Sequence, residues 1–141
     1  MLFKKLTEDA VTPHYAHEGD SGFDLYTAEE VILLPGERTA ISTGLKFFLP
    51  RDLGMQIRPR SGNSLSGKYG DVLLGTIDNG YTGEVKIITA NYSNKPITIP
   101  KGTKLAQAVM EKVINVSFTE TTEDLPNTNR GEKGFGSTGV R

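Results

Sequence analysis

Residues 31–59 read VILLPGERTAISTGLKFFLPRDLGMQIRP, and they are the clearest guide to the architecture. The apolar runs in this stretch are short, are rich in Val, Ile, Leu and Phe, and end at Pro35-Gly36, Gly44, Pro50 and Pro59. Short runs of this kind between turn residues are typical of β-strands. No apolar repeat of three to four residues continues long enough to indicate a long helix. The stretch therefore predicts a series of short strands, with breaks at its glycines and prolines.

The same pattern continues toward the C-terminus. Residues 83–92 alternate in part between apolar and polar, and residues 96–100 form an apolar run between two prolines. Residues 105–113 are compatible with a strand or a helix, and their β-branched side chains favour a strand. We expect one short helix, around residues 64–69. The chain is therefore predicted to be a single all-β sandwich or barrel.

Two turns are marked by their residues. Asn79-Gly80 is the strongest short-range signal for a two-residue hairpin turn. Pro100-Lys101-Gly102 has the composition of a second hairpin turn. We therefore expect residues 74–83 to form a β-hairpin, with Asp78 beside its tip.

Composition excludes several classes of function. The chain has 141 residues, 16 Lys plus Arg, 17 Asp plus Glu, no Cys and a formal net charge of −1. The lack of Cys excludes disulfide scaffolds, thiolate zinc sites and cysteine nucleophiles, and two histidines disfavour an all-histidine metal site. The balanced charge predicts no stable binding to nucleic acid or to a membrane. Because no secretory signal and no apolar run of 18 residues is present, we expect a cytoplasmic protein, or one of the host cytoplasm if its source is viral.

The last part of the chain differs from the rest. Residues 119–141 contain Thr, Asn, Gly and charged residues but few apolar ones, so they cannot pack on themselves. We therefore expect a β core over residues 1–118 and a C-terminal arm over residues 119–141 that needs another surface to lie on.

Two segments are candidates for binding phosphate. Residues 58–64 place arginines beside hydroxyls and a glycine at the start of the predicted helix, which are the groups that bind oxyanions. A solvated basic loop is the alternative. Residues 130–139 combine Arg130 with glycines and with Phe135, whose ring offers a stacking surface, so they indicate a closing lid. A flexible linker is the alternative there.

Two further segments carry carboxylates. Asp78 lies next to the predicted hairpin turn, where it could accept a proton from water while the strand backbone reads a base. The alternative is an aspartate that only supports the turn. Asp24 follows Gly19-Asp20-Ser21-Gly22 at the start of a strand, and on its own this pattern favours a turn with a side-chain cap.

Five segments together resemble a known family. The chain is similar to the trimeric dUTP diphosphatases (dUTPases) from about residue 19 to residue 139, and five ordered segments are far more specific than any one alone. The segments are GFDL from Gly22, PRSG from Pro59, GTIDNGYTG from Gly75, GTKLAQ from Gly102 and RGEKGFGSTG from Arg130.

The resemblance implies a fold, an assembly and a reaction. It implies a jelly-roll protomer of the β-clip type, a homotrimer with sites at its subunit interfaces, and an arm swapped onto a neighbouring subunit to close the site. It implies hydrolysis of dUTP to dUMP and pyrophosphate, which keeps uracil out of DNA and supplies dUMP for dTMP synthesis. Asp78 would activate a water molecule for attack on the α-phosphorus, with Mg²⁺ held by the substrate phosphates and by water.

The resemblance also assigns roles to other residues. Asp24 would hold water around Mg²⁺. The phosphates would be bound by Arg60, Ser61, Gly62, Gln107, Arg130 and Ser137. The nucleoside would be bound by Gly75, Thr76, Ile77, Tyr81, Lys86 and Phe135.

The chain departs from the family pattern, and two other functions compete. Lys104 stands where many members have Arg, and Lys133 replaces a common glycine of the arm. A dCTP deaminase shares the fold, but its catalytic glutamate falls on Ile88, which cannot transfer protons. A non-enzymatic nucleotide- or protein-binding module is the second alternative, and an Asp78→Asn variant would discriminate it from an enzyme.

Overall fold

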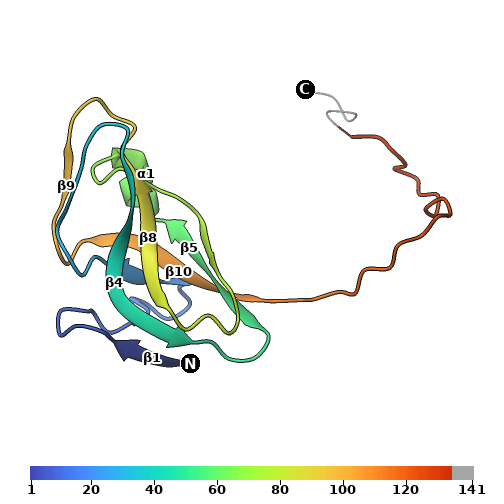
Figure 1. Cartoon of the computed structure of the whole chain (residues 1–141), viewed down its shortest axis with the longest axis horizontal. Helices are drawn as coiled ribbons and strands as arrows, with labels where there is room; N and C mark the ends of the chain where they lie inside the picture. The colour runs from blue at the N-terminus through green and yellow to red at the C-terminus, as the bar shows by residue number, and fades with distance from the viewer. Residues whose placement is uncertain (135–141) are drawn as a thin grey trace.

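The structure is a computed structural model that describes residues 1–134, and it is almost entirely β (Figure 1). The described residues form strands β1 to β10 and one short helix, so the predicted all-β class is confirmed. The elements are β1 (Leu2–Lys5), β2 (Gly22–Tyr26), β3 (Val31–Leu33), β4 (Arg38–Phe48), β5 (Leu53–Pro59), α1 (Ser61–Ser66), β6 (Asp71–Val72), β7 (Gly75–Ile77), β8 (Glu84–Ala90), β9 (Ile97–Ile99) and β10 (Lys104–Lys112).

Two four-stranded antiparallel sheets enclose one apolar core. The first sheet has the order β1-β4-β8-β6 and the second has the order β2-β10-β5-β7, while β3 and β9 form a small separate pair. Side chains alternate between the core and the surface, as in β8, where Val85 and Ile87 are buried and Lys86 and Ile88 are exposed. Ile87 packs in the same buried cluster as Leu25 and Ile57 of the second sheet. The double sheet is the predicted jelly roll.

The predicted break at Gly44 is wrong. Strand β4 continues through it as a β-bulge, because its register with β8 shifts between Ser42 and Leu45. Gly44 has a φ of 67°, which a glycine adopts without strain. A side chain there would also place its Cβ 2.9 Å from the Cβ of Ala10. The glycine therefore bends the strand instead of ending it.

The two predicted hairpins are also wrong, although both turns form. The amide of Tyr81 donates a hydrogen bond to the carbonyl of Asp78 (3.1 Å), but β7 pairs with β5 whereas β8 pairs with β4 and β6. The Asn79 side chain instead donates to the carbonyls of Pro50 and Leu53, at 2.7 and 2.9 Å, and so ties the turn to the β4–β5 connection.

The turn after Pro100 behaves in the same way, because β9 pairs with β3 and β10 pairs with β2 and β5. Turn residues reverse the chain locally, but apolar faces select the strand partners. Both pairs of flanking strands therefore separate into different sheets.

The helix begins earlier than predicted. It covers Ser61–Ser66 instead of residues 64–69. It also ends earlier, because Gly67 adopts the left-handed conformation, with a φ of 62°, and terminates the helix. The buried Asn63 side chain accepts from the amide of Tyr69 (3.0 Å) and donates to the carbonyl of Gly70 (2.9 Å). These bonds fix the helix against the chain that follows it.

The chain after β10 leaves the sheets. Residues 113–133 are exposed and contain no helix or strand, and Figure 1 shows this segment running away from the double sheet. Ile114, Val116 and Phe118 are among the most exposed apolar side chains of the described chain. Within residues 1–134, no helix is long and apolar enough to cross a membrane.

Candidate active site

A pocket of about 330 Å³ brings together most of the residues predicted to bind phosphate, and the aspartate predicted to hold magnesium-bound water. These residues lie together because strand β10 pairs with β2 on one side and with β5 on the other. Gln107 is opposite Asp24 of β2 and opposite Arg58 of β5. The end of β5 leads directly into Arg60 and α1. The residues of this pocket that the sequence singled out are Asp24, Arg60, Ser61, Gly62 and Gln107.

Two cations share the carboxylate of Asp24. Arg60 Nε lies 2.8 Å from Oδ1, and Lys104 Nζ lies 3.2 Å from Oδ2. The Arg60 Nη1 group also donates to the carbonyl of Lys104 (3.2 Å). The carboxylate of Asp24, with a further contribution from Tyr26, raises the pKa of Lys104. The cluster therefore carries a net positive charge, which suits a polyphosphate.

Gln107 and Gly22 shape the same pocket. The Gln107 Nε2 group donates to the carbonyl of Pro59 (2.9 Å), which holds β10 against the end of β5. A Cβ on Gly22 would lie 3.0 Å from Gln107 Oε1 and 3.0 Å from the carbonyl oxygen of Ala108. The glycine therefore leaves room for the Gln107 side chain, a contribution that the sequence did not reveal because the contact crosses two strands.

A second pocket, of about 540 Å³, is lined by most of the residues predicted to bind the nucleoside and by the predicted catalytic aspartate. Strand β7 and the following turn contribute Thr76, Ile77, Asp78 and Tyr81, while β8 contributes Lys86. Gly75 of β7 is not part of the lining and pairs instead with Ile57. The lining is completed by three residues without a predicted binding role, Ala40, Glu84 and Ile88.

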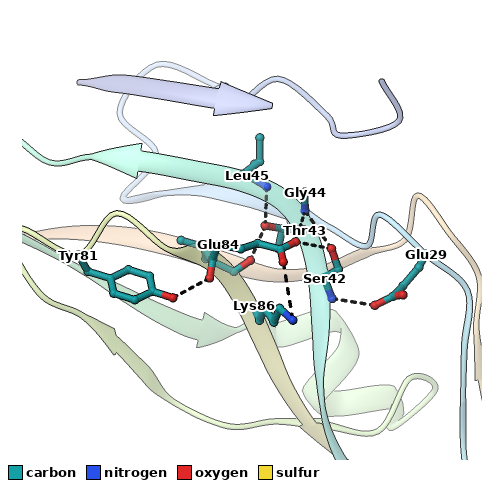
Figure 2. Close-up of polar contacts among 9 residues, drawn as sticks. Glu29, Ser42, Thr43, Gly44, Leu45, Tyr81, Glu84 and Lys86 are labelled. Atoms are coloured by element: carbon teal, nitrogen blue, oxygen red, sulfur yellow. Dashed lines mark hydrogen bonds and ion pairs between the residues drawn. The ribbon is translucent and has the colours of Figure 1, made fainter. Parts of the chain in front are cut away.

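Glu84 is the centre of a polar network in this pocket (Figure 2). Its Oε1 atom accepts from the Ser42 hydroxyl and from the amide of Gly44 (3.0 Å), and its Oε2 atom lies 3.7 Å from Lys86 Nζ. The Tyr81 hydroxyl donates to the backbone carbonyl of Glu84 (3.0 Å). Burial alone would raise the pKa of Glu84, but the bonds from Ser42 and Gly44 and the charge of Lys86 lower it.

In the single chain the two pockets are separate, because they share no lining residue. Arg130 lines neither of them, and its Nε group donates to the carbonyl of Lys133 (3.1 Å) within the exposed segment. Phe135 and Ser137 lie outside the described residues. In the described part of the chain, no three His, Asp or Glu side chains cluster in a way that could hold a metal ion.

Comparisons with known proteins agree on one family. The family model described as dUTPase matches residues 8–139. A deoxyuridine 5'-triphosphate nucleotidohydrolase of Clostridium kluyveri is 46% identical over 99% of this chain and 98% of its own length. The enzyme of the same name from Clostridium novyi is 47% identical over 99% of both chains.

Solved structures give the same result. The dUTPase of Staphylococcus bacteriophage 80alpha with dUpNHpp superposes with a TM-score of 0.90, at 28% identity over 99% of this chain and 98% of that chain. A mutant dUTPase from phage phi11 of S. aureus, described with a coordinated structural Mg(II) ion, superposes with a TM-score of 0.82. It has 26% identity over 87% of this chain and 97% of that chain.

Proposed function

The chain belongs to the dUTPase family, and we propose that it hydrolyses dUTP to dUMP and pyrophosphate. The observation that carries the proposal is the position of Asp78, which lines a nucleoside-sized pocket with Thr76, Ile77 and Tyr81. A separate pocket on the same chain is lined by Arg60 and Ser61, which offer a guanidinium and a hydroxyl to a triphosphate. The reaction would keep uracil out of DNA and supply dUMP for dTMP synthesis in the cytoplasm.

Asp78 acts as the general base in this proposal. Its carboxylate takes a proton from water while the water oxygen attacks the α-phosphorus, and the bond to the oxygen that bridges the α- and β-phosphates breaks. Pyrophosphate leaves with that oxygen, and dUMP remains. Because Asp78 is exposed on a turn, water reaches it freely in the substrate-free protein.

The base and sugar are bound along β7. Among residues 1–134 this strand pairs with β5 alone and forms the edge of its sheet. The other side of its backbone can therefore pair with uracil, as proposed for Gly75, Thr76 and Ile77. Tyr81 packs on the deoxyribose and leaves no room for a 2′-hydroxyl. Lys86 and Phe135 complete the proposed nucleoside contacts, Lys86 from the pocket wall and Phe135 as a stacking lid.

The phosphates are bound at the pocket beside the cluster of Asp24, Arg60 and Lys104. Arg60, Ser61, Gly62 and Gln107 surround it, and phosphoryl transfer depends mainly on positioning and on positive charge around the oxygens. Arg130 and Ser137 of the arm add contacts to the terminal phosphate.

Bound with the substrate, Mg²⁺ would offset negative charge on the phosphate oxygens, and Asp24 would hold its water molecules. The donors present fit this arrangement, because Asp24 already shares its two oxygens with Arg60 and Lys104. Such a carboxylate suits hydrogen bonding to the ion's water molecules better than direct ligation.

Completion of the site requires other subunits in this proposal. Because the two pockets of one chain share no lining residue, we infer that a homotrimer brings a phosphate pocket of one subunit to a nucleoside pocket of the next. The arm over residues 119–141 lies across a neighbouring subunit, beyond the core of residues 1–118. The residues just before the arm would contact the same neighbour, which would bury the exposed side chains of Ile114, Val116 and Phe118.

Deamination does not suit the pocket. Ile88 lines it at the position where the deaminase relative carries its catalytic glutamate, and an aliphatic side chain cannot transfer protons.

Product analysis tests the proposal. The purified protein is incubated with dUTP, dCTP, dTTP or UTP in Mg²⁺, and pyrophosphate and ammonia are followed in parallel. We expect pyrophosphate from dUTP alone. The Asp78→Asn variant should bind a non-hydrolysable dUTP analogue normally while kcat falls by about 10²–10⁴-fold, and Asp71→Asn on β6 is the matched control. Ammonia from dCTP, full activity of Asp78→Asn, or no product from any substrate would overturn the proposal.

A further inference from the structure

We propose that Glu84 is a positioning residue that holds the Lys86 ammonium in the nucleoside pocket by anchoring it to the bulge of β4. The inference rests on the proposed function, because it concerns how the same pocket binds dUTP. It assigns a role to a residue that lines the pocket without a predicted contact to the substrate.

The bulge supplies the anchor. Ser42 is opposite Lys86 and Leu45 is opposite Val85, so Thr43 and Gly44 have no partner residue in β8. The Thr43 hydroxyl donates to the carbonyl of Val85 (2.6 Å), and this bond replaces one of the backbone hydrogen bonds that the bulge removes between β4 and β8. The amide of Gly44 finds its acceptor in the Glu84 carboxylate (3.0 Å). The carboxylate thus satisfies a backbone group that the bulge removes from regular pairing.

The second oxygen of the same carboxylate faces Lys86. Glu84 and Lys86 are two residues apart on β8 and project from the same face of the strand. Lys86 Nζ lies 3.7 Å from Glu84 Oε2, and its side chain is 49% exposed. A lysine with this exposure samples many rotamers unless a charge holds its ammonium. Glu84 can hold it because its other oxygen is fixed by Ser42 and Gly44 (Figure 2).

The contact to Tyr81 is separate from this anchor. The Tyr81 hydroxyl donates to the backbone carbonyl of Glu84, so a change of the Glu84 side chain leaves that bond in place. Side-chain variants of Glu84 therefore report on the bulge and on Lys86.

The Glu84→Gln variant separates these two contacts. The amide oxygen still accepts from Ser42 and Gly44, but the charge that holds Lys86 is lost. We expect KM for dUTP, and Kd for a non-hydrolysable dUTP analogue, to rise about fivefold, the upper range for a partly exposed ion pair. We expect kcat to stay within about twofold, because the base Asp78 is not involved.

Two further variants make the test specific. If Glu84 acts through Lys86, the double variant Glu84→Gln/Lys86→Met binds no more weakly than Lys86→Met alone. Glu29→Gln is the matched control, because the Glu29 carboxylate accepts from the Ser42 amide (3.1 Å) but does not line the pocket. It should leave KM unchanged even if it lowers Tm.

The outcomes separate this inference from the proposed function. Unchanged KM and Kd in Glu84→Gln, additive effects in the double variant, or an equal rise in Glu29→Gln would overturn the role of Glu84 while dUTP hydrolysis stands. If the wild-type protein binds the analogue but does not hydrolyse dUTP, the proposed hydrolysis is overturned. The Kd values of wild type and Glu84→Gln can still be compared in that case. A wild-type protein that does not bind the analogue would overturn both.

Discussion

Arg60 Nε lies 2.8 Å from Asp24 Oδ1, so the guanidinium proposed to bind phosphate is held by the carboxylate proposed to hold magnesium-bound water. Lys104 takes the other oxygen of the same carboxylate. This contact orients Arg60 before any substrate arrives, and a preoriented cation loses less conformational entropy when it binds phosphate. Lys104, which departs from the family pattern, is therefore part of the cation cluster.

Removing the charge of Lys104 should weaken dUTP binding. In Lys104→Met, Asp24 would pair with Arg60 alone and the cluster would lose its net positive charge, so we expect KM for dUTP to rise several-fold at fixed Mg²⁺. Lys104→Arg should restore it, because the guanidinium keeps the charge. Steady-state kinetics measure both. Lys101→Met is the control, because Lys101 pairs with Asp9 away from the pocket, and an equal KM rise there would contradict the prediction.

Removing residues 130–141 should sharply reduce turnover without unfolding the core. Within residues 1–134, the last strand ends at Lys112, and the side-chain hydrogen bonds of residues 119–134 stay within that segment. We expect an unchanged Tm and a mass by light scattering near three times that of the truncated chain. We expect kcat/KM for dUTP to be at least about 100-fold lower, because groups that close and orient the site are lost.

Two results would contradict the proposed role of the arm in a site shared between subunits. A truncated protein with the full rate would contradict its role as a lid. A full-length protein that is active as a monomer would contradict a site shared between subunits.

Stability should depend on pH through Glu84. Its pKa is lowered in the folded protein, so its contribution to stability is fully present above the unfolded-state value of about 4.3 and is lost as pH falls through the lower folded-state value. We therefore expect wild type to exceed Glu84→Gln in free energy of unfolding near neutral pH, and the difference to shrink in acid. Urea unfolding of both proteins across this range measures it. A difference that grows in acid would have the wrong sign.

Two glycines after the helix should respond differently to alanine. Gly67 and Gly70 both have positive φ, 62° and 75°, so either substitution costs about 1–2 kcal/mol in backbone strain. A Cβ on Gly70 would also lie 2.6 Å from the carbonyl oxygen of Ala90, whereas a Cβ on Gly67 meets nothing within 4 Å. We expect Gly70→Ala to lose about 1–3 kcal/mol more than Gly67→Ala in chemical unfolding. Equal losses would contradict the close approach.

Local patterns explain which parts of the fold could be predicted. The strands at Val31–Leu33, Ile97–Ile99 and Lys104–Lys112 lie close to where short apolar runs and prolines placed them. The hairpin at Asn79-Gly80 does not form, because a turn signal says nothing about the sheet that each flanking strand joins. The break predicted at Gly44 is wrong for a related reason. A glycine that ends a strand and a glycine that forms a bulge have the same sequence pattern, and only the partner strand distinguishes them.

The candidate site also has a part that the sequence could predict and a part that only the structure shows. The resemblance implies phosphate binding for Arg60 and Gln107 and the holding of magnesium-bound water for Asp24. These three residues line one pocket because β10 pairs with both β2 and β5. Their proposed roles stay predictions. In the sequence, Lys104 stands out only as a departure from the family pattern, because its contact with Asp24 joins residues that are 80 positions apart.

The amino-acid order thus determined the strand positions, the turns and the set of chemical groups available, because these depend on neighbours within a few residues. The tertiary structure decided which strands pair and which side chains meet. The Glu84 carboxylate bonds to Ser42 and Gly44, which lie 42 and 40 residues earlier in the chain. No local pattern specifies such a bond, because it exists only when a bulge in β4 leaves an amide that β8 must satisfy.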